Sequence, residues 1–481
     1  MIRKKITRKA VILILLVVSF AYFIYLSYGQ HQILAQEKIL DTNNLQDIFN
    51  NAEANSVITL DEGTYHLSGY IQLPKNDNVT IDASKSIFSG SATFLSAENS
   101  GLKWKGGTFI GNGVNRFGFT LLHQKNAEFS GIQFNRATAF GQHVFDLLGC
   151  SNITFTDNIF AGYGNTVSVS GLTSTQKYAE AIQTDYALEG ASGSSNADDK
   201  LKSFGGRFDG SATANILVKS NQFIPYKENG NILSWGQSPI GQHLYGKNVQ
   251  NHDITFTKNT VTDPIPLNTI DQNKYTGAIH FVSIKNLLIT DNIFKSSNAK
   301  RENWIQICNN ANTTNPGTGN GQLPTSGVNI TRNNFYGSEP TKSYINLVSD
   351  KNNAKFKITN TKISNNAYLN SKSAEPKNLI LLTDVKSQIE KPNAYGNHGL
   401  VERTIINYTG KINVSSRVDG VYKSSPYGTP GYKKLGTTAD KTYKNKTIKI
   451  TEEQKNLKST YVKGTIDGTN YIFIDKRAIG R

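Results

Sequence analysis

The stretch Asn152-Ile-Thr-Phe-Thr-Asp-Asn-Ile-Phe160 is one copy of a repeat that decides the fold. Within it, apolar Ile153 and Phe155 alternate with polar Thr154 and Thr156, which is the period of a β-strand with one buried face. No single copy can bury that face alone, so neighbouring copies must stack on one another. The copies begin at Asn78, Gly101, Asn126, Asn152, Asn215, Asp253, Asn286, Gly327 and Phe356.

Strand-sized units at this spacing, with no helical pattern between them, predict an all-β chain built as a parallel β-helix. The polar residue that turns each copy is usually Asn, as at Asn158, and stacked Asn side chains can form hydrogen-bonded ladders along such a solenoid. Upstream, Leu45–Ala52 has the i, i+3, i+4 spacing of a short amphipathic helix. We expect this helix to cover the open first rung.

The distance between copies changes along the chain. The first three steps are 23, 25 and 26 residues, and the next four are 63, 38, 33 and 41. The longest step holds an insertion at roughly residues 165–214 that is rich in Gly, Ser and Ala. Because insertions in solenoids form loops, often on the binding face, the rungs between Asn126 and Gly327 are where we expect a cleft.

The start of the repeat region also carries a family resemblance. Ile58-Thr-Leu60 followed by Gly63-Thr-Tyr65 is similar to the opening of pectate-lyase-like right-handed parallel β-helix proteins. The resemblance extends over residues 41–400, and the arrangement of Glu180–Asp185 resembles β-helix proteins of Gram-positive bacteria. It implies the fold more strongly than a reaction, because this fold is shared by lyases, hydrolases, epimerases and binding proteins.

The charge of +16 is concentrated at the two ends of the chain. Residues 1–30 carry +5 and no acid, residues 401–481 carry +9, and the remaining 370 residues carry only +2. Residues 10–28 contain no charge and follow the basic cluster directly, which predicts a signal anchor that spans the membrane and leaves the rest outside the cell. The alternative is a signal peptide that is cleaved, which would make the protein secreted. A near-neutral solenoid without a phosphate loop gives no reason to expect nucleic acid as a partner.

Residues 402–481 have a different character, with no repeats and many Lys and Tyr. Tyr432-Lys433-Lys434 and Tyr471-Ile-Phe-Ile-Asp-Lys-Arg-Ala-Ile479 resemble the GW modules of Gram-positive surface proteins, except that the Gly-Trp pair reads Ile472-Phe473. The resemblance implies a small SH3-like β-barrel that binds the cell wall. The +9 charge independently favours a polyanion such as a teichoic acid, with Tyr432, Lys433, Lys434 and Tyr471 as candidate contacts.

Candidate site residues gather in the rungs with long insertions. If Phe145, Ile182, Ile279 and Ile305 point inward, their polar neighbours line one exterior face, at about 4.8 Å from rung to rung. Glu180 has the inward phase but begins its strand, so a turn could expose it. The candidate catalytic residues are Asp185, Glu180, Asp146, His143, His243 and His280, and the candidate substrate-binding residues are Gln183, Tyr186, Trp304, Gln306 and Asp209.

These residue types favour cleavage of a polysaccharide. Glycoside hydrolysis needs one protonated carboxyl group and one carboxylate, which Asp185 can supply with Glu180 or Asp146. Tyr186 and Trp304 offer ring faces for sugar stacking. A polysaccharide lyase and a non-catalytic glycan-binding adhesin are the alternatives. The chain has no Cys/His cluster spaced for zinc, so no metal is expected, and Ca²⁺ would enter only with a lyase.

Overall fold

The computed structural model describes most of the chain from Leu40 onward. The predicted membrane anchor and Tyr432 lie outside the described residues. Within the described residues, no helix is long and apolar enough to cross a membrane. The described residues are 40–173, 176, 180–265, 277–297, 303–309, 323–337, 343–349, 357–370, 380–383, 387–389, 402–413, 418–423, 433–455 and 459–480.

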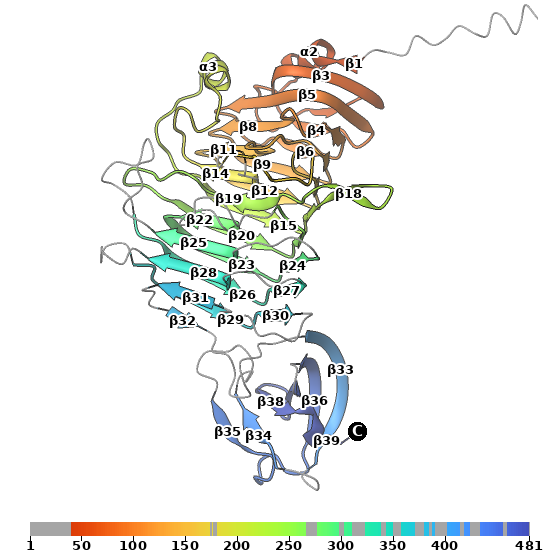
Figure 1. The fold of residues 1–481 in the computed structure, drawn as a ribbon, viewed down its shortest axis with the longest axis vertical. Coiled ribbons are helices and arrows are strands. Elements are labelled where there is room, and N and C mark those ends of the chain that lie inside the picture. Colours follow the sequence, from red (N-terminus) through yellow and green to blue (C-terminus); the bar gives the residue numbers. More distant parts are fainter. Residues whose placement is uncertain are drawn as a thin grey trace, which may run out of the picture.

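Parallel strands stack into a β-helix, as the repeat predicted (Figure 1). The strands of the repeat itself form the first face, an 11-stranded parallel sheet. Ile153 stacks between Ala127 and Ile216 of the neighbouring rungs. The strands are β2 (Val57–Thr59), β4 (Thr80–Asp82), β6 (Lys103–Lys105), β9 (Lys125–Ser130), β12 (Ser151–Thr156), β15 (Ala214–Lys219), β20 (Asn251–Thr257), β23 (Ile284–Thr290), β26 (Ser326–Thr331), β29 (Thr361–Ser364) and β32 (Ser387–Ile389).

A second and a third face belong to one 19-stranded sheet, because the long strands β3 (Gly63–Gln72) and β5 (Ser86–Ala97) run through both. β1 (Leu40–Asp41) pairs with β3. The second face holds β7 (Thr108–Ile110), β10 (Gln133–Asn135), β13 (Ile159–Ala161), β16 (Gln222–Ile224), β21 (Thr260–Thr262), β24 (Ile293–Ser296), β27 (Asn334–Gly337) and β30 (Ala367–Asn370). The third face holds β8 (Gly118–Leu122), β11 (Phe145–Leu148), β14 (Glu180–Asp185), β19 (Ser238–Gly241), β22 (Gly277–Val282), β25 (Asn303–Asn309), β28 (Ser343–Ser349) and β31 (Ile380–Thr383).

The core follows the alternation of the repeat. Ile153 and Phe155 are fully buried between the faces, and Thr154 and Thr156 on the other side of the strand are partly exposed. Aromatic rings stack from rung to rung, with 5.4 Å between the centroids of Phe129 and Phe155. Such offset or stacked pairs add to the free energy gained from burying apolar area. One contiguous core therefore runs the length of the solenoid.

The predicted Asn ladder is confirmed. Nδ2 of each ladder residue donates to Oδ1 of the next at 2.9–3.2 Å. Each Nδ2 also donates to a main-chain carbonyl, as from Asn259 to Val218 O at 2.9 Å. The ladder therefore satisfies main-chain groups that the turn leaves buried without a strand partner. Its members are Asn158, Asn221, Asn259, Asn292, Asn333 and Asn366, all buried.

The first residue of each copy adopts a left-handed backbone conformation, for example φ 58° at Asn152 and φ 72° at Gly327. Asn, Asp and Gly are the residues that enter this region at low cost, which explains why they begin the copies. The predicted start of the last copy at Phe356 lies outside the described residues. There the left-handed residue is Asn360, with φ 51°, directly before β29, so the predicted start is wrong by four residues.

The predicted N-terminal cap is present as helix α2 (Thr42–Asn50), which lies over the first rung (Figure 1). Asp41 forms a capping box with Asn44 that satisfies main-chain N–H groups at the start of the helix. Leu45 and Phe49 are buried, and the ring of Phe49 contacts Trp104 edge-on at 6.2 Å. The helix thus closes the apolar end of the solenoid.

A separate antiparallel sheet forms the C-terminal domain, at the opposite end of the solenoid from α2 (Figure 1). Ile472 and Phe473, which stand where a GW module has Gly-Trp, are buried in its strand β38. The domain has its own apolar core around Val421, Ile450 and Ile474. Its elements are β33 (Glu402–Ile412), β34 (Gly420–Tyr422), β35 (Lys434–Thr437), β36 (Thr447–Lys455), β37 (Thr460–Thr465), β38 (Tyr471–Asp475), the short 3-10 helix η4 (Lys476–Ala478) and β39 (Ile479–Gly480).

Two further elements interrupt the solenoid. The hairpin β17 (Tyr226–Glu228) and β18 (Asn231–Ser234) projects between β16 and β19. Helix α3 (Ser195–Ser203) lies in the longest insertion, where the sequence predicted a loop and no helix. Ser194 caps α3 by accepting a hydrogen bond from the N–H of Ala197 at 3.3 Å.

Candidate active site

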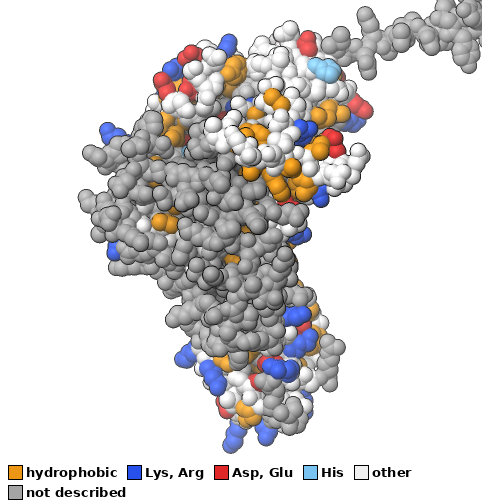
Figure 2. All heavy atoms as spheres, viewed as in Figure 1, with side chains coloured by type: hydrophobic (Ala, Val, Ile, Leu, Met, Phe, Trp, Pro, Cys, Tyr) orange, Lys and Arg blue, Asp and Glu red, His pale blue; other side chains and the backbone are white. Residues whose placement is uncertain are grey.

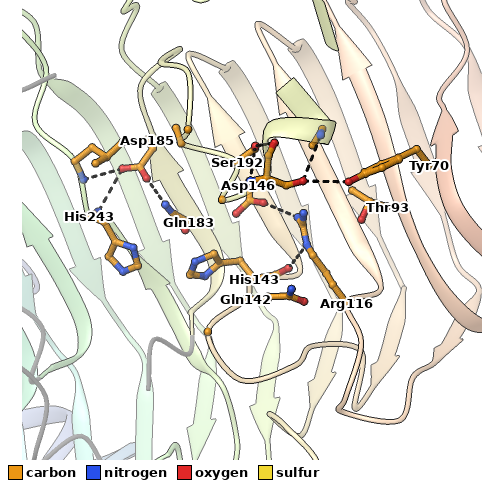
Figure 3. A pocket seen from close by; sticks show the side chains of 17 residues that line it. Tyr70, Thr93, Arg116, Gln142, His143, Asp146, Gln183, Asp185, Ser192 and His243 are labelled. Carbon is orange, nitrogen blue, oxygen red and sulfur yellow. Dashed lines mark hydrogen bonds and ion pairs between the residues drawn. The ribbon is translucent and has the colours of Figure 1, made fainter. Parts of the chain in front are cut away.

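A cavity of about 390 Å³ lies against the outer side of the third face, beneath the insertion that contains α3 (Figure 3). Its floor comes from the strands β3, β5, β11 and β14 and from residues directly before β8 and β11 and directly after β19, and its wall comes from residues 190–197. This position agrees with the prediction of a cleft among the irregular rungs. The lining residues are Tyr70, Thr93, Arg116, Gly141, Gln142, His143, Asp146, Gln183, Asp185, Gly190, Ala191, Ser192, Gly193, Ser194, Ala197, His243 and Leu244.

The strand register places the predicted polar residues in one row. Thr120, Asp146 and Gln183 occupy equivalent positions in β8, β11 and β14. The row continues through Gly241 in β19 to His280 in β22 and Gln306 in β25. The residues predicted to point inward, Phe145, Ile182, Ile279 and Ile305, are all in the core. The inside-outside alternation of the third face is therefore confirmed.

The insertion seals an apolar strip beside this row. Leu122 and Leu148 point away from the main core, and Ala197 and Leu201 of α3 pack against them in a second, smaller core. Ser192 and Ser194 of the same insertion line the cavity. Polar groups of the third face are thus buried under the insertion, in a medium of lower dielectric constant than water.

Asp146 lies at the centre of the floor and is 2% exposed. Its Oδ2 is 2.6 Å from Nη2 of Arg116 and accepts a hydrogen bond from Thr120 Oγ1 at 3.3 Å. Its Oδ1 has no hydrogen-bond partner among the described residues. Burial raises the pKa of Asp146 to about 6, and the opposing charge of Arg116 and the Thr120 hydrogen bond offset only part of that rise.

Asp185 ends β14 and is fully buried. Its Oδ1 accepts hydrogen bonds from the main-chain N–H groups of His243 at 3.3 Å and Leu244 at 3.1 Å, and its Oδ2 accepts one from the Gln183 amide. Burial raises the pKa of Asp185 to about 6, with the charge of His243 and the hydrogen bond from Gln183 acting in the other direction. Two buried carboxyl groups therefore face the same cavity (Figure 3).

Glu180 is the centre of a histidine cluster. Its Oε2 lies 3.3 Å from Nδ1 of His143 and 3.3 Å from Nε2 of His243, and its Oε1 lies 2.9 Å from Nε2 of His280. The carboxylate is 1% exposed, so the prediction that a turn could expose Glu180 is wrong. The three histidines can reach it because β11, β14, β19 and β22 stack as four consecutive rungs.

Electrostatics in this cluster favour a charged glutamate. Burial alone would raise the pKa of Glu180, but the charges of His243 and His280 and their hydrogen bonds outweigh it and hold the pKa well below its usual range. Burial lowers the pKa of His143 to about 3, so that ring is neutral at pH 7. His243 is affected in the opposite direction: burial alone would lower its pKa, but the charge of Glu180, the hydrogen bond to Glu180 and the charges of Asp185 and Asp146 together raise it.

Gly241 makes room for this cluster. A Cβ at position 241 would lie 2.5 Å from Nε2 of His280 and 2.7 Å from Cγ of Glu180. Neither distance is tolerated between non-bonded atoms without a shift of buried side chains. Gly241, which lies between Gln183 and His280 in the row, is therefore part of the site, although nothing in the repeat pattern points to it.

The two predicted stacking residues are not available for sugar. Trp304 is fully buried and packs against Phe294 and Phe335, with 5.6 Å between the centroids of Trp304 and Phe294. It stands near the start of β25, where the turn directs the ring into the core. Tyr186 is also fully buried, and its hydroxyl accepts a hydrogen bond from the main-chain N–H of Asn251 at 3.3 Å. The prediction that these rings are exposed is wrong.

Two other predicted residues lie outside the cavity lining. Asp209 is 3.2 Å from Nε2 of His123, a pairing that nothing in the repeat pattern indicates. Gln306 is buried beside His280 in the next rung. Arg116, which lines the cavity beside Asp146, is a candidate site residue that the sequence analysis missed. The sequence held one indication of its role. Arg116 is a basic residue next to a buried strand in a near-neutral solenoid, and an Arg in such a place needs an acidic partner.

The candidate wall-binding residues that the structure describes lie on the surface of the C-terminal domain. Lys433 and Lys434 are exposed, and Tyr471 is 45% exposed with Nζ of Lys463 at 4.8 Å from its ring centroid. Figure 2 shows Lys and Arg side chains spread over this domain. The surface is thus basic and carries an accessible aromatic ring.

Comparison with known proteins adds a domain assignment. Residues 402–480 match the GW (Gly-Tryp) dipeptide domain. The C-terminal segment is a GW domain. No curated protein matches the chain.

Solved structures similar to the chain include three bacterial proteins. The Streptococcus pneumoniae surface protein and adhesin PfbA is 14% identical, with 73% of this chain and 91% of PfbA covered and a TM-score of 0.48. An alginate lyase from Paenibacillus sp. str. FPU-7 is 12% identical, with 72% and 97% covered and a TM-score of 0.39. The catalytic unit of a GH87 alpha-1,3-glucanase from Streptomyces thermodiastaticus strain HF3-3 is 11% identical, with 69% and 62% covered and a TM-score of 0.40.

Proposed function

We propose that this protein is a cell-surface glycoside hydrolase that cleaves a polysaccharide in the cavity of its β-helix and is held at the cell wall by its GW domain. The observation that carries the proposal is the presence of two buried carboxyl groups, Asp146 and Asp185, in one cavity of about 390 Å³. Glycoside hydrolysis needs one carboxyl group that donates a proton and one carboxylate that activates water or attacks the sugar.

The contacts of the two groups suggest their roles. Both oxygens of Asp185 accept hydrogen bonds, which stabilises its carboxylate form. The pKa of both groups is raised to about 6, and Asp146 differs in having an Oδ1 with no hydrogen-bond partner among the described residues. In this proposal Asp146 is the proton donor and Asp185 is the base or nucleophile. Glu180, which the sequence had offered as a partner of Asp185, is held away from the cavity by histidines.

The surroundings of Arg116 favour hydrolysis over elimination. A lyase must neutralise the carboxylate of a uronic acid, and Arg116 is the one Arg or Lys among the described residues that line the cavity. Its donors are already engaged, with Asp146 at 2.6 Å, Thr120 at 2.9 Å and the main-chain carbonyl of His143 at 2.8 Å. An uncharged sugar therefore suits the described lining better than a uronate.

Wall attachment rests on a separate part of the chain. The GW domain presents Lys433, Lys434 and the ring of Tyr471, and a basic surface of this kind binds acidic polymers through charge. A teichoic acid is the polymer whose phosphate charge fits it best. Such a domain would hold the catalytic solenoid against its substrate.

The test is release of reducing sugar from a panel of wall and capsular polysaccharides by the purified protein. Asp146→Asn and Asp185→Asn should each lower the rate by about 10²–10⁴-fold while binding of the polysaccharide is kept. Azide should partly restore the Asp185→Asn variant and leave Asp146→Asn unchanged if the roles are as proposed. Asp82→Asn, on the surface of β4, is the matched control and should keep the parental rate.

Other outcomes would assign the site differently. Products that absorb ultraviolet light through an unsaturated uronate would establish a lyase. Binding of a glycan without release of sugar, in the parent protein and on every polysaccharide, would make the protein an adhesin.

A further inference from the structure

The cluster around Glu180 brings together side chains that are far apart in the sequence. His143, Glu180, His243 and His280 come from four consecutive rungs of the third face. Each histidine directs a ring nitrogen at the carboxylate, at 2.9–3.3 Å. Because both carboxylate oxygens are acceptors, each of these nitrogens must carry a proton or share a cation with the carboxylate.

The separations match those around a bound metal ion. Zinc bonds of about 2.0–2.1 Å in a tetrahedral site place neighbouring ligand atoms about 3.3 Å apart. Nδ1 of His143 and Nε2 of His243 both lie 3.3 Å from Oε2 of Glu180. Ligand atoms of these three residues all lie within 4.8 Å of one another. Two imidazoles and one carboxylate are also a ligand set that zinc takes in proteins.

We propose that His143, Glu180 and His243 bind a divalent first-row transition metal ion, with Zn²⁺ as the best-fitting ion. His280 has a different part, because its Nε2 faces the other carboxylate oxygen, Oε1, at 2.9 Å. Its remaining ring nitrogen lies 3.4 Å from the carbonyl of Gly277. His280 is therefore an outer partner that orients Glu180, as hydrogen-bonded neighbours of metal ligands commonly do.

The site is buried but reachable. The side chain of Glu180 is 1% exposed, and those of His143 and His243 are 10% and 12% exposed. His143 and His243 both line the cavity, so an ion can enter from it and a fourth coordination position can face it. The missing side chain at Gly241 gives Glu180 and His280 the space they need.

The competing explanation is a cluster held together by protons alone. Three imidazole N–H groups donating to one buried carboxylate would satisfy the same atoms without a metal. One contact favours the proton cluster, because Nδ1 of His143 also lies 3.0 Å from the main-chain carbonyl of Glu180, to which only a protonated nitrogen donates. The two explanations differ most directly in metal content. Metal content is therefore the decisive measurement, and it requires protein without an affinity tag that binds metal.

The experiment incubates untagged full-length protein with ZnCl₂, removes loose ions by dialysis and measures zinc by mass spectrometry. The parent should retain about one Zn²⁺ per chain. Glu180→Gln should reduce this to the background, whereas His280→Gln should retain zinc with an affinity about 10–100-fold weaker. His66→Ala is the matched control, because His66 is exposed and outside the cluster, and it should bind like the parent.

A second measurement on the parent avoids dependence on the variants. Co²⁺ in place of Zn²⁺ should give the intense visible absorption of a tetrahedral or five-coordinate site. EDTA should abolish this absorption and also any increase in thermal stability that the bound metal produces. Zinc at background in the dialysed parent, with no cobalt spectrum, would overturn the proposal in favour of the proton cluster. Equal zinc loss in His66→Ala and Glu180→Gln would also overturn it, by showing binding elsewhere. These outcomes do not depend on whether the protein cleaves a glycan.

Discussion

Replacing Asp146 by Asn should change how the stability of the β-helix depends on pH. Burial raises the pKa of Asp146 to about 6 in the folded state, whereas an unfolded chain has the ordinary value near 3.8. A carboxyl group with a raised pKa binds its proton more tightly in the folded state. Its contribution is therefore fully present below the unfolded pKa and is lost as the pH rises through the folded pKa.

The size of the effect follows from the two pKa values. A difference of roughly 2 pKa units corresponds to about 3 kcal/mol of folding free energy at low pH. Between pH 7.5 and pH 4.5 about 2 kcal/mol of this is gained, because at pH 4.5 the group is protonated in the folded state and largely ionised in the unfolded state. The amide of the Asp146→Asn variant cannot titrate, so the difference in unfolding free energy between parent and variant should shift by about 2 kcal/mol in favour of the parent.

Urea unfolding at the two pH values, followed by tryptophan fluorescence, measures this difference. The chain has three Trp residues, and all of them, Trp104, Trp235 and Trp304, lie in the β-helix, so the GW domain does not contribute. Asp82→Asn is the control, because hydrogen bonds from Ser84 lower the pKa of Asp82 and nothing titrates there in this range. A difference for Asp146→Asn that stays constant across the range would refute the reasoning. A shift of opposite sign would mean that Arg116, not burial, dominates.

Further predictions concern the ladder, the glycine in the site and the GW domain. Asn259→Ala removes four hydrogen bonds and leaves the N–H of Asn221 buried without its acceptor, so it should lower the unfolding free energy, measured by urea titration, by about 3–6 kcal/mol. Asn152→Gly removes an exposed hydrogen bond to Asn126 and should cost under about 1 kcal/mol in the same titration. Gly241→Ala should destabilise the β-helix by about 1–3 kcal/mol, read from its thermal midpoint, and an unchanged midpoint would contradict the close packing. Tyr471→Ala should weaken sedimentation of the protein with isolated cell walls, and added salt should weaken it further if charge dominates.

The fold was readable from the sequence because the repeat carries its physical cause in each copy. The alternation at Ile153 and Phe155 fixes which side chains enter the core, and Asn158 must pair with its counterpart in the next rung. The left-handed conformation at Asn152 accounts for the residue type that begins a copy. The start predicted at Phe356 failed because it followed the alternation of Phe356 and Ile358 rather than the Asn that begins a copy. The left-handed residue, Asn360, is the better marker.

The site was readable only in part. The same alternation correctly put Asp146 and Gln183 on one outer row, because strand register transmits position from rung to rung. It failed at strand ends, where Trp304 turns into the core and Glu180 turns towards the histidines. Alternation also says nothing about what covers an outer face, so α3 and the burial it causes were not foreseen.

That burial is what separates the site from the rest of the solenoid. Along most of its length the outer face can carry polar side chains in contact with water, where an Asp keeps an ordinary pKa. Where β11 and β14 lie side by side, the outer face also carries Leu148, the last residue of β11. An apolar side chain in this place is favourable only if another apolar group covers it. Ala197 and Leu201 of α3 provide that cover, and the same segment shields Asp146 and Asp185 from water. An insertion that pairs with a leucine of the outer face thus turns part of a regular scaffold into a site with perturbed carboxyl groups.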